Sequence, residues 1–201
     1  MMSGGAQTFF LPGAGGSAAF WRPVAELARL EGVFFAWPGL GAEPAEPGVR
    51  GMDDLVQRVL ERMNAPPVDL VAQSMGGVVA LKVALAAPDR VRRLVLAVTS
   101  GGVPVAGLGG ADWRPEYFAA FPQAASWIAE PVEDLSEKIR TLQVPTLLLW
   151  GGRDEISPVA VGERLRDLLP DARLCVMPEA GHDLAQTHAE WVAREVVGFL
   201  G

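Results

Sequence analysis

The sequence predicts an α/β fold, with a mostly parallel sheet of about six strands and helices on both faces. Short apolar runs alternate along the chain with segments of helical spacing, which is typical of strand–helix–strand units and hence of parallel sheets. Several runs are nearly continuous in valine, leucine and phenylalanine, as strands buried on both faces are. The chain has 201 residues, half of them apolar, so it is long enough for one self-sufficient core and is not a disordered chain.

Six apolar runs are the expected strands, and each is followed by a loop or by a segment of helical spacing. In chain order they are Thr8–Leu11, Val33–Trp37, Val68–Ala72, Arg93–Val98, Thr146–Trp150 and Arg173–Met177. Because carboxyl ends of parallel strands meet at one edge of a sheet, residues just after these runs are expected to lie together.

The first two expected helices have recognisable ends or faces. Pro23–Leu30 carries a proline in its first turn and Gly32 just past its end, the usual asymmetry of helix termini. Asp53–Met63 places Leu55 and Val59 on one face, which predicts an amphipathic helix lying on the sheet.

Three further helices are expected between and after the later strands. Ser74–Ala87 is almost wholly apolar and should be central and buried. Pro158–Leu169 is amphipathic, with Ser157 as its expected N-cap, and Ala185–Leu200 is amphipathic as well.

The stretch between residues 100 and 143 breaks the alternation and is expected to be a short helical lid within a single domain of residues 1–201. It opens with a loop rich in glycine and proline and continues with large apolar side chains. Either these side chains form an apolar roof over a substrate site, or they pack a small helical cap onto the sheet. The expected substrate-contacting residues are Trp113, Tyr117, Phe118, Phe121 and Trp127.

Composition excludes several classes of function. A net charge of −7 argues against nucleic acid or an anionic membrane as the main partner, since both require a basic face. Cys175 is the only cysteine, so no intramolecular disulfide can form, and with two histidines no metal site and no cofactor are expected. Residues 1–7 lack the pattern of a signal peptide, so a cytoplasmic location is expected; the oligomeric state is left open.

The strongest chemical signal is Ser74, which follows a buried strand and directly precedes a helix. Ala72, Gly76 and Gly77 surround it with small side chains, as a tight strand-to-helix turn requires. Such a turn strains the backbone of the serine and exposes its hydroxyl at the carboxyl edge of the sheet, over a helix N-terminus. The plainer interpretation is a small-residue turn without chemistry.

A glycine-rich loop, Gly13–Gly16, follows the first strand. Its glycines allow a sharp turn that points backbone N–H groups at a ligand. The loop lacks both the lysine of a phosphate loop and the spacing of a dinucleotide-binding motif, because position 18 is alanine. An anion hole for acyl transfer therefore fits better, and a bare tight turn is the alternative.

Two further polar residues follow later strands. Asp154 lies four residues beyond the fifth expected strand, with Glu155 as the alternate acid. His182 lies in the loop after the last strand, whereas His188 falls inside the last expected helix. With Ser74 at the same edge, Asp154 and His182 are the expected acid and base of a nucleophilic site.

These residues resemble the α/β-hydrolase superfamily, in particular its small single-domain, esterase-like members, over nearly the whole chain. The order Ser74, Asp154, His182 matches the family's order of nucleophile, acid and histidine. Residues 12–16 look like the family's oxyanion motif, and residues 37–41 resemble the loop after its next strand. The resemblance implies an oxyanion hole made by the backbone N–H groups of Ala14 and Met75.

The chain departs from the family pattern in three places. Ala72 stands for the usual first glycine of the serine turn, and Pro12 for the usual histidine of the oxyanion motif. Only about ten residues precede the oxyanion loop, too few for the two antiparallel strands with which the family's sheet usually begins. A trimmed sheet is therefore expected, with Val33–Trp37 at one edge.

The resemblance implies a serine hydrolase that acts through an acyl-enzyme on an uncharged, apolar carboxylic ester or thioester. The same three residues could instead serve a lyase or a carbon–carbon bond hydrolase, because a fold does not determine its reaction. A non-catalytic ligand-binding or signalling protein of the same fold, and a nucleotide binder built on Gly13–Gly16, are the alternatives from other classes.

Overall fold

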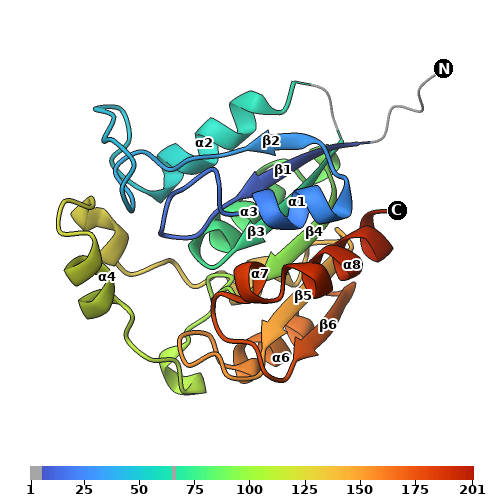
Figure 1. The fold of residues 1–201 in the computed structure, drawn as a ribbon. Helices are drawn as coiled ribbons and strands as arrows, with labels where there is room; N and C mark the ends of the chain where they lie inside the picture. Colours follow the sequence, from blue (N-terminus) through green and yellow to red (C-terminus); the bar gives the residue numbers. More distant parts are fainter. Residues whose placement is uncertain (1–5, 65–66) are drawn as a thin grey trace.

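The computed structural model describes residues 6–64 and 67–201, so most of the N-terminal segment judged above for a signal peptide lies outside the described residues. Its centre is a six-stranded sheet in the order β2-β1-β3-β4-β5-β6, with every neighbouring pair parallel (Figure 1). The strands are β1 (Gln7–Leu11), β2 (Gly32–Phe34), β3 (Val68–Gln73), β4 (Val91–Ala97), β5 (Thr146–Gly151) and β6 (Ala172–Met177). The predicted fold class is thus confirmed, with the second strand at one edge of the sheet.

Helices cover both faces of the sheet. One face carries α1 (Arg22–Ala28), α7 (Leu184–Thr187) and α8 (Ala189–Leu200); the other carries α2 (Met52–Arg62), α3 (Met75–Ala86), α5 (Ser136–Ile139) and α6 (Val159–Leu168). A single turn of 3-10 helix, η1 (Pro88–Arg90), precedes β4.

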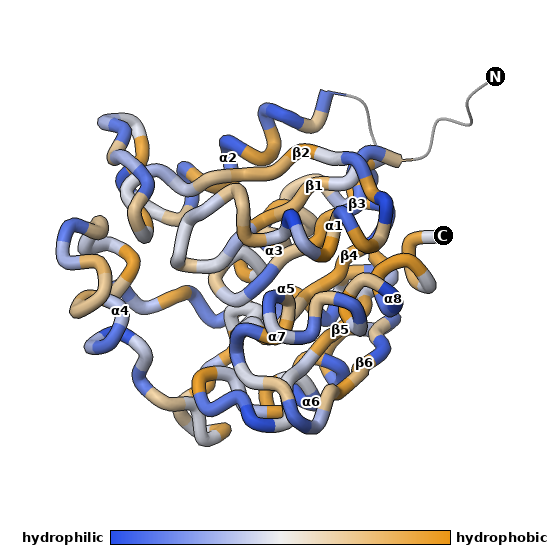
Figure 2. Tube along the Cα trace, viewed as in Figure 1, coloured by the Kyte–Doolittle hydropathy of each residue, from blue (hydrophilic) through white to orange (hydrophobic). Residues whose placement is uncertain are grey.

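Alternation along each central strand builds two hydrophobic cores. Leu70 and Ala72 of β3 face α2 and α3, whereas Val71 between them faces α1 and α8. Figure 2 shows the central strands in hydrophobic colours and the helices with mixed faces around them. The fully buried β3 and β5 account for the continuous apolar runs of the sequence.

The segment joining β4 to β5 is the largest departure from the alternation; its residues 100–145, which follow Val98 and Thr99 at the end of β4, are here termed the insertion. It holds η2 (Ala106–Leu108), α4 (Arg114–Ala120), η3 (Ser126–Ala129) and, at its return to the sheet, α5. In Figure 1, α4 lies beyond the carboxyl ends of the strands, away from the two helical layers. The insertion therefore stands on the side of the sheet where Ser74, Asp154 and His182 were expected.

Two local expectations were wrong. Ser157 does not cap α6: Pro158 holds the N-cap position, and the Ser157 hydroxyl donates instead to the Thr99 carbonyl at 3.2 Å. The last helix is not continuous, because the backbone leaves helical geometry at His188, between α7 and α8. Of the described helices, none is long and apolar enough to span a membrane.

Candidate active site

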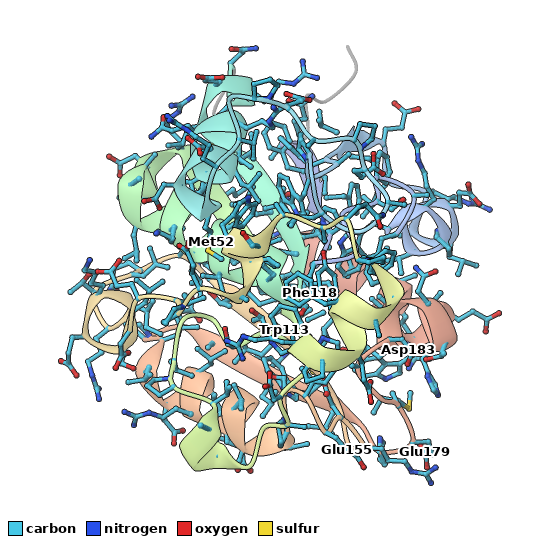
Figure 3. All side chains as sticks on the ribbon, turned by 90° about the vertical axis from the view of Figure 1, so that its left-hand side faces the viewer. Met52, Trp113, Phe118, Glu155, Glu179 and Asp183 are labelled. Carbon is cyan, nitrogen blue, oxygen red and sulfur yellow. The ribbon has the colours of Figure 1, made fainter. Side chains whose placement is uncertain are left out.

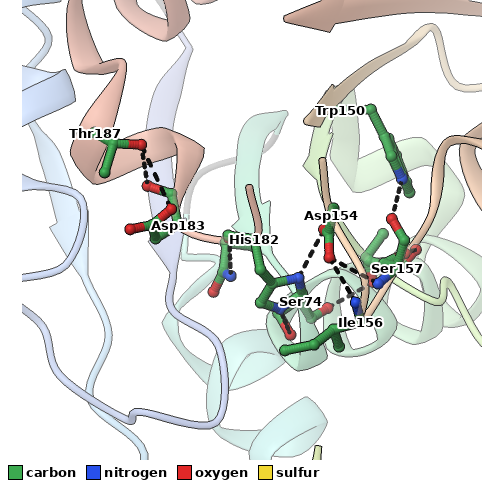
Figure 4. Close-up of polar contacts among 10 residues, drawn as sticks. Ser74, Trp150, Asp154, Ile156, Ser157, His182, Asp183 and Thr187 are labelled. Atoms are coloured by element: carbon green, nitrogen blue, oxygen red, sulfur yellow. Dashed lines mark hydrogen bonds and ion pairs between the residues drawn. The ribbon is translucent and has the colours of Figure 1, made fainter. Parts of the chain in front are cut away.

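Three side chains from three loops meet at the carboxyl edge of the sheet (Figure 4). Ser74 stands between β3 and α3, Asp154 follows β5, and His182 follows β6. The Ser74 Oγ lies 3.0 Å from Nε2 of His182, and Nδ1 of the same ring lies 2.8 Å from Oδ2 of Asp154. The three residues singled out from the sequence thus form one continuous chain of polar contacts.

Burial differs along this chain. The Asp154 side chain is fully buried, and the His182 side chain is 24% exposed. A carboxylate held in a buried position can fix which ring nitrogen of the imidazole carries a proton. The His182 ring is thus part-exposed, whereas the carboxylate that orients it is closed off from solvent.

The turn at Ser74 has the strained backbone that the sequence predicts. Its φ and ψ are 52° and −125°, in a region that residues other than glycine rarely adopt. A Cβ at Gly76 would lie 2.3 Å from the Pro12 carbonyl oxygen, and one at Gly77 would lie 2.5 Å from Oγ1 of Thr99. Both glycines are therefore needed for α3 to begin so close to neighbouring segments.

Thr99 braces this turn, and sequence reasoning missed it. Its buried hydroxyl donates to the Ser74 carbonyl at 2.6 Å and accepts from the Gly101 N–H at 3.0 Å. The preceding Val98 has φ of 44°, an unusual value for a β-branched residue. No local pattern marks Thr99, because its partner Ser74 lies 25 residues away, in the turn that follows another strand.

Asp154 is held by the loop that carries it. Its Oδ1 accepts hydrogen bonds from the backbone N–H groups of Ile156 and Ser157, both at 2.9 Å, which leaves Oδ2 for His182. The alternate acid, Glu155, is exposed on the molecular surface (Figure 3). Of the two carboxylates, Asp154 is the one that contacts the histidine.

Gln73 connects the serine turn to the histidine loop. Its side chain is buried and its Nε2 donates to the His182 carbonyl at 3.3 Å. A Cβ at Gly13 would lie 2.2 Å from its Oε1, so the same side chain also packs beneath the glycine-rich loop. Sequence reasoning passed over Gln73; its place directly before the candidate nucleophile was the available signal.

The glycine-rich loop forms a tight turn beside Ser74. The Gly16 N–H donates to the Gly13 carbonyl at 3.0 Å, with Ala14 between them, and a Cβ at Gly13 would lie 3.0 Å from that of Ser74. Met75 is the first residue of α3, where backbone N–H groups have no helical acceptor. Both amides expected in an oxyanion hole therefore belong to segments that adjoin the serine.

The aromatic residues of the insertion are half-buried. Trp113, Tyr117, Phe118 and Trp127 pack against the core that holds α2 and α3, and Phe121 stacks near Tyr117 with ring centroids 5.3 Å apart. In Figure 3, Trp113 and Phe118 lie in front of the carboxyl end of the sheet. These positions agree equally with a roof over the site and with simple packing.

Other polar groups lie apart from this chain of contacts. Nδ1 of His188 lies 3.0 Å from the neighbouring Thr187 hydroxyl, at the break between α7 and α8. Across residues 6–64 and 67–201, no group of three or more histidine, cysteine or acidic side chains is arranged to hold a metal ion.

The chain is similar to known proteins in sequence and in fold. The sequence is 29% identical to the dihydrolipoyllysine-residue acetyltransferase component of an acetoin cleaving system from Pseudomonas putida, over 98% of this chain but 64% of that longer protein. It is also 29% identical to a putative carbamate hydrolase, RutD, from Variovorax paradoxus, over 94% of this chain and 89% of the other. Among solved structures, a thermophilic esterase from Thermogutta terrifontis superposes with a TM-score of 0.78 at 23% identity, covering 98% and 89% of the two chains.

A family-wide sequence profile gives the assignment. The profile of the alpha/beta hydrolase family matches residues 9–195, which include all six strands except the first residues of β1 and every candidate site residue. Relatives named as hydrolases make an enzyme, rather than a binding or signalling protein, the class to which the chain is assigned. The chain therefore belongs to the alpha/beta hydrolase family.

Proposed function

We propose that this enzyme is a serine hydrolase that cleaves uncharged, apolar carboxylic esters or thioesters through an acyl-enzyme intermediate. The observation that carries the proposal is the chain of contacts from the Ser74 hydroxyl through the His182 ring to the buried Asp154 carboxylate. An alcohol that hydrogen-bonds an imidazole, itself oriented by a carboxylate, is an activated nucleophile.

In this mechanism Ser74 Oγ attacks the acyl carbonyl carbon and His182 Nε2 takes its proton. Asp154 keeps Nδ1 protonated and stabilises the imidazolium. The tetrahedral intermediate collapses as the histidine gives its proton to the leaving alcohol or thiol. A water molecule, deprotonated by the same ring, then attacks the acyl-enzyme, releases the acid and restores the serine.

The oxyanion of both tetrahedral intermediates would be stabilised by the backbone N–H groups of Ala14 and Met75. Donors aimed at developing charge are each worth on the order of 10²–10³ in rate. The turn from Gly13 to Gly16 and the first turn of α3 flank Ser74, so both can offer N–H groups to one oxygen.

The charges around the site disfavour an anionic substrate. Glu155, Glu179 and Asp183 are exposed and lie on the face that carries the site (Figure 3). Arg153 is exposed as well, and of the cationic side chains in the described ranges none makes a hydrogen bond or ion pair with Ser74, Asp154 or His182. The aromatic side chains of the insertion would supply apolar contacts for the acyl or alcohol portion.

A labelling experiment tests the nucleophile. Purified protein is treated with a fluorophosphonate and the adduct is located by mass spectrometry. Labelling is expected on Ser74 and should be lost in the His182→Ala variant. A folded protein that stays unlabelled, or that is labelled elsewhere, contradicts the mechanism.

A substrate panel tests the reaction class. It compares short and medium esters, thioesters, carboxylate-bearing esters and a β-diketone that reports carbon–carbon cleavage, with Ser74→Ala as control. Uncharged esters or thioesters should be turned over best. A clear preference for the diketone would instead establish the carbon–carbon bond hydrolase, and a preference for anionic esters would refute the substrate class.

A further inference from the structure

One hydroxyl group joins three segments that are far apart in the sequence. The Tyr117 Oη donates to the Ala14 carbonyl at 2.8 Å and accepts a hydrogen bond from the Gly41 N–H at 2.9 Å. Tyr117 belongs to α4, Ala14 to the turn after β1, and Gly41 to the loop after β2. The insertion thus touches the candidate oxyanion turn directly through a polar group.

Both peptide groups around Ala14 are restrained. The carbonyl of the peptide before it, at Gly13, accepts from the Gly16 N–H at 3.0 Å. The carbonyl of the peptide after it accepts from Tyr117. An amide N–H points opposite to the carbonyl of its own planar peptide, so the Gly13 carbonyl orients the Ala14 N–H directly. The Ala14 carbonyl belongs to the next peptide plane, so its bond to Tyr117 anchors the other side of the Ala14 Cα and restricts rotation of the first plane.

The loop after β2 locks onto the same turn. A Cβ at Gly41, whose φ is +55°, would lie 2.0 Å from the Gly15 carbonyl oxygen. The Trp37 backbone N–H donates to the Gly16 carbonyl at 2.9 Å, and the Trp37 indole N–H donates to the Pro12 carbonyl at 2.7 Å. The Tyr117 hydroxyl therefore adds a hydrogen-bonded link between two loops that already pack closely against each other.

The tyrosine ring and its proton are themselves well held. Trp113, Phe118 and Phe121 surround the ring, with centroids 5.3 to 5.4 Å away. Burial raises the pKa of Tyr117 above its ordinary value of 10.0, so the hydroxyl keeps its proton and remains a donor at neutral pH.

We propose that Tyr117 is a positioning residue that holds the turn at Ala14, and through this turn the Ala14 N–H, in the arrangement needed to stabilise the oxyanion. This inference rests on the proposed serine hydrolase mechanism and assigns Tyr117 a role different from the substrate contact expected from its sequence. Tyr117 would position the oxyanion turn through its hydroxyl group, whereas it would contact a substrate through its ring.

The structure offers a matched pair of variants. Tyr117→Phe removes the hydroxyl and keeps the ring. Gln123→Ala removes another bond between the insertion and the same loop, the one from Nε2 of Gln123 to the Gly41 carbonyl at 3.2 Å, without touching the turn at Ala14. The bond from the Ala125 N–H to the Gly39 carbonyl at 2.7 Å remains in both variants.

Steady-state kinetics on esters of increasing acyl length provide the test. Tyr117→Phe should lower kcat about tenfold at every chain length and leave KM within about twofold, because a less well-oriented oxyanion donor loses part of the stabilisation that it gives only to the transition state. Gln123→Ala should keep kcat. Affinity for a boronic acid, which forms a tetrahedral adduct on the serine, should fall in Tyr117→Phe by about the same factor as kcat.

Three results would overturn the proposal: an unchanged kcat in Tyr117→Phe, a loss that appears in KM and grows with acyl length, or an equal loss in Gln123→Ala. All rates are compared at a temperature where circular dichroism shows each variant fully folded. Ser74→Ala separates the two hypotheses, because wild-type activity that survives in Ser74→Ala refutes the mechanism itself, whatever the tyrosine variant does.

Discussion

The carboxyl edge of the sheet and the insertion above it hold their side chains by different means. Ser74, Thr99 and Asp154 are fixed by hydrogen bonds to buried backbone groups at the ends of long central strands. The insertion contains helices of three to seven residues and is attached to the loop after β2 by a few hydrogen bonds and by aromatic packing. In this enzyme the groups proposed for chemistry thus sit on the rigid part, and those proposed for selectivity on the part more easily rearranged.

The hydrogen bonding of buried polar side chains also differs between the insertion and the sheet edge. Within the described residues, Nε1 of Trp127, in the insertion, is the one buried side-chain nitrogen or oxygen atom without a hydrogen-bond partner. At the sheet edge the buried hydroxyls of Thr99 and Ser157 both have partners. Because unpaired buried groups reduce stability, the insertion should open more readily than the sheet edge.

The largest effect is expected from breaking the contact chain at the sheet edge. Ser74→Ala and His182→Ala should each lower kcat by roughly 10⁴–10⁶-fold, because residues that act as a unit lose similar amounts when either is removed. His188→Ala is the control, since its ring contacts Thr187 rather than Ser74. Ester hydrolysis assays that show His188→Ala, and not His182→Ala, to be inactive would reverse the assignment.

A smaller loss is expected from Asp154→Asn. The amide oxygen could still accept from Ile156 and Ser157, but the amide group would donate to Nδ1 of His182 and so favour the wrong tautomer. The expected loss in kcat is about 10⁴-fold with little change in Tm. Glu155→Gln serves as the control, because that side chain is exposed; if it proved the more damaging change, the acid would be misassigned.

Rigidity of the serine turn can be tested by adding one methyl group. In Gly76→Ala the new Cβ would meet two backbone oxygens, at 2.3 and 2.8 Å, so α3 or the turn after Leu11 must shift. We expect a loss of about 1–3 kcal/mol in unfolding free energy together with a clear fall in activity. Gly198→Ala, in an exposed stretch of α8 with open space around it, should be neutral or slightly stabilising in the same denaturation experiment.

A structural feature could be predicted from the sequence when the residues that determine it are close together in the chain. The turn at Ser74 could be predicted because its requirements, a strand, small neighbours and a helix, all lie within a few residues. The contacts of Thr99 and Gln73 could not be predicted, because their partners at Ser74 and His182 are 25 and 109 residues away. Ser157 was misjudged because a tertiary acceptor, the Thr99 carbonyl, draws its hydroxyl away from the helix end.

Distant partners also limited what could be predicted about the insertion from the sequence. Its aromatic composition predicted apolar packing, and the rings are indeed half-buried against the core. The composition did not predict which side chains would also make polar contacts. The polar contact of Tyr117 depends on a turn 103 residues away. The contact chain of Ser74, Asp154 and His182 was accessible only because parallel strands bring their carboxyl ends together.

Removal of the Thr99 hydroxyl is expected to have a moderate effect, mainly on the stability of the protein. Thr99→Val keeps the shape but leaves the Ser74 carbonyl and the Gly101 N–H without this partner in a buried place. The expected cost is about 1–3 kcal/mol in unfolding free energy by urea denaturation. Thr141→Val, which removes an exposed hydroxyl bonded to the Lys138 carbonyl, should cost less than about 0.5 kcal/mol; equal costs would mean that the turn is not braced as described.

The smallest effect is expected in the insertion, and it decides between roof and packing. Phe118 is half-buried and lies over the carboxyl end of the sheet. If its ring contacts the acyl chain, Phe118→Ala should raise KM about three- to tenfold for medium-chain esters and leave acetate esters nearly unchanged, since burial of a few methylenes is worth about 1 kcal/mol each. If the ring only packs the insertion onto the sheet, KM stays constant across chain lengths and the loss appears in Tm. Measuring both quantities on one variant therefore separates a selective surface from a structural one.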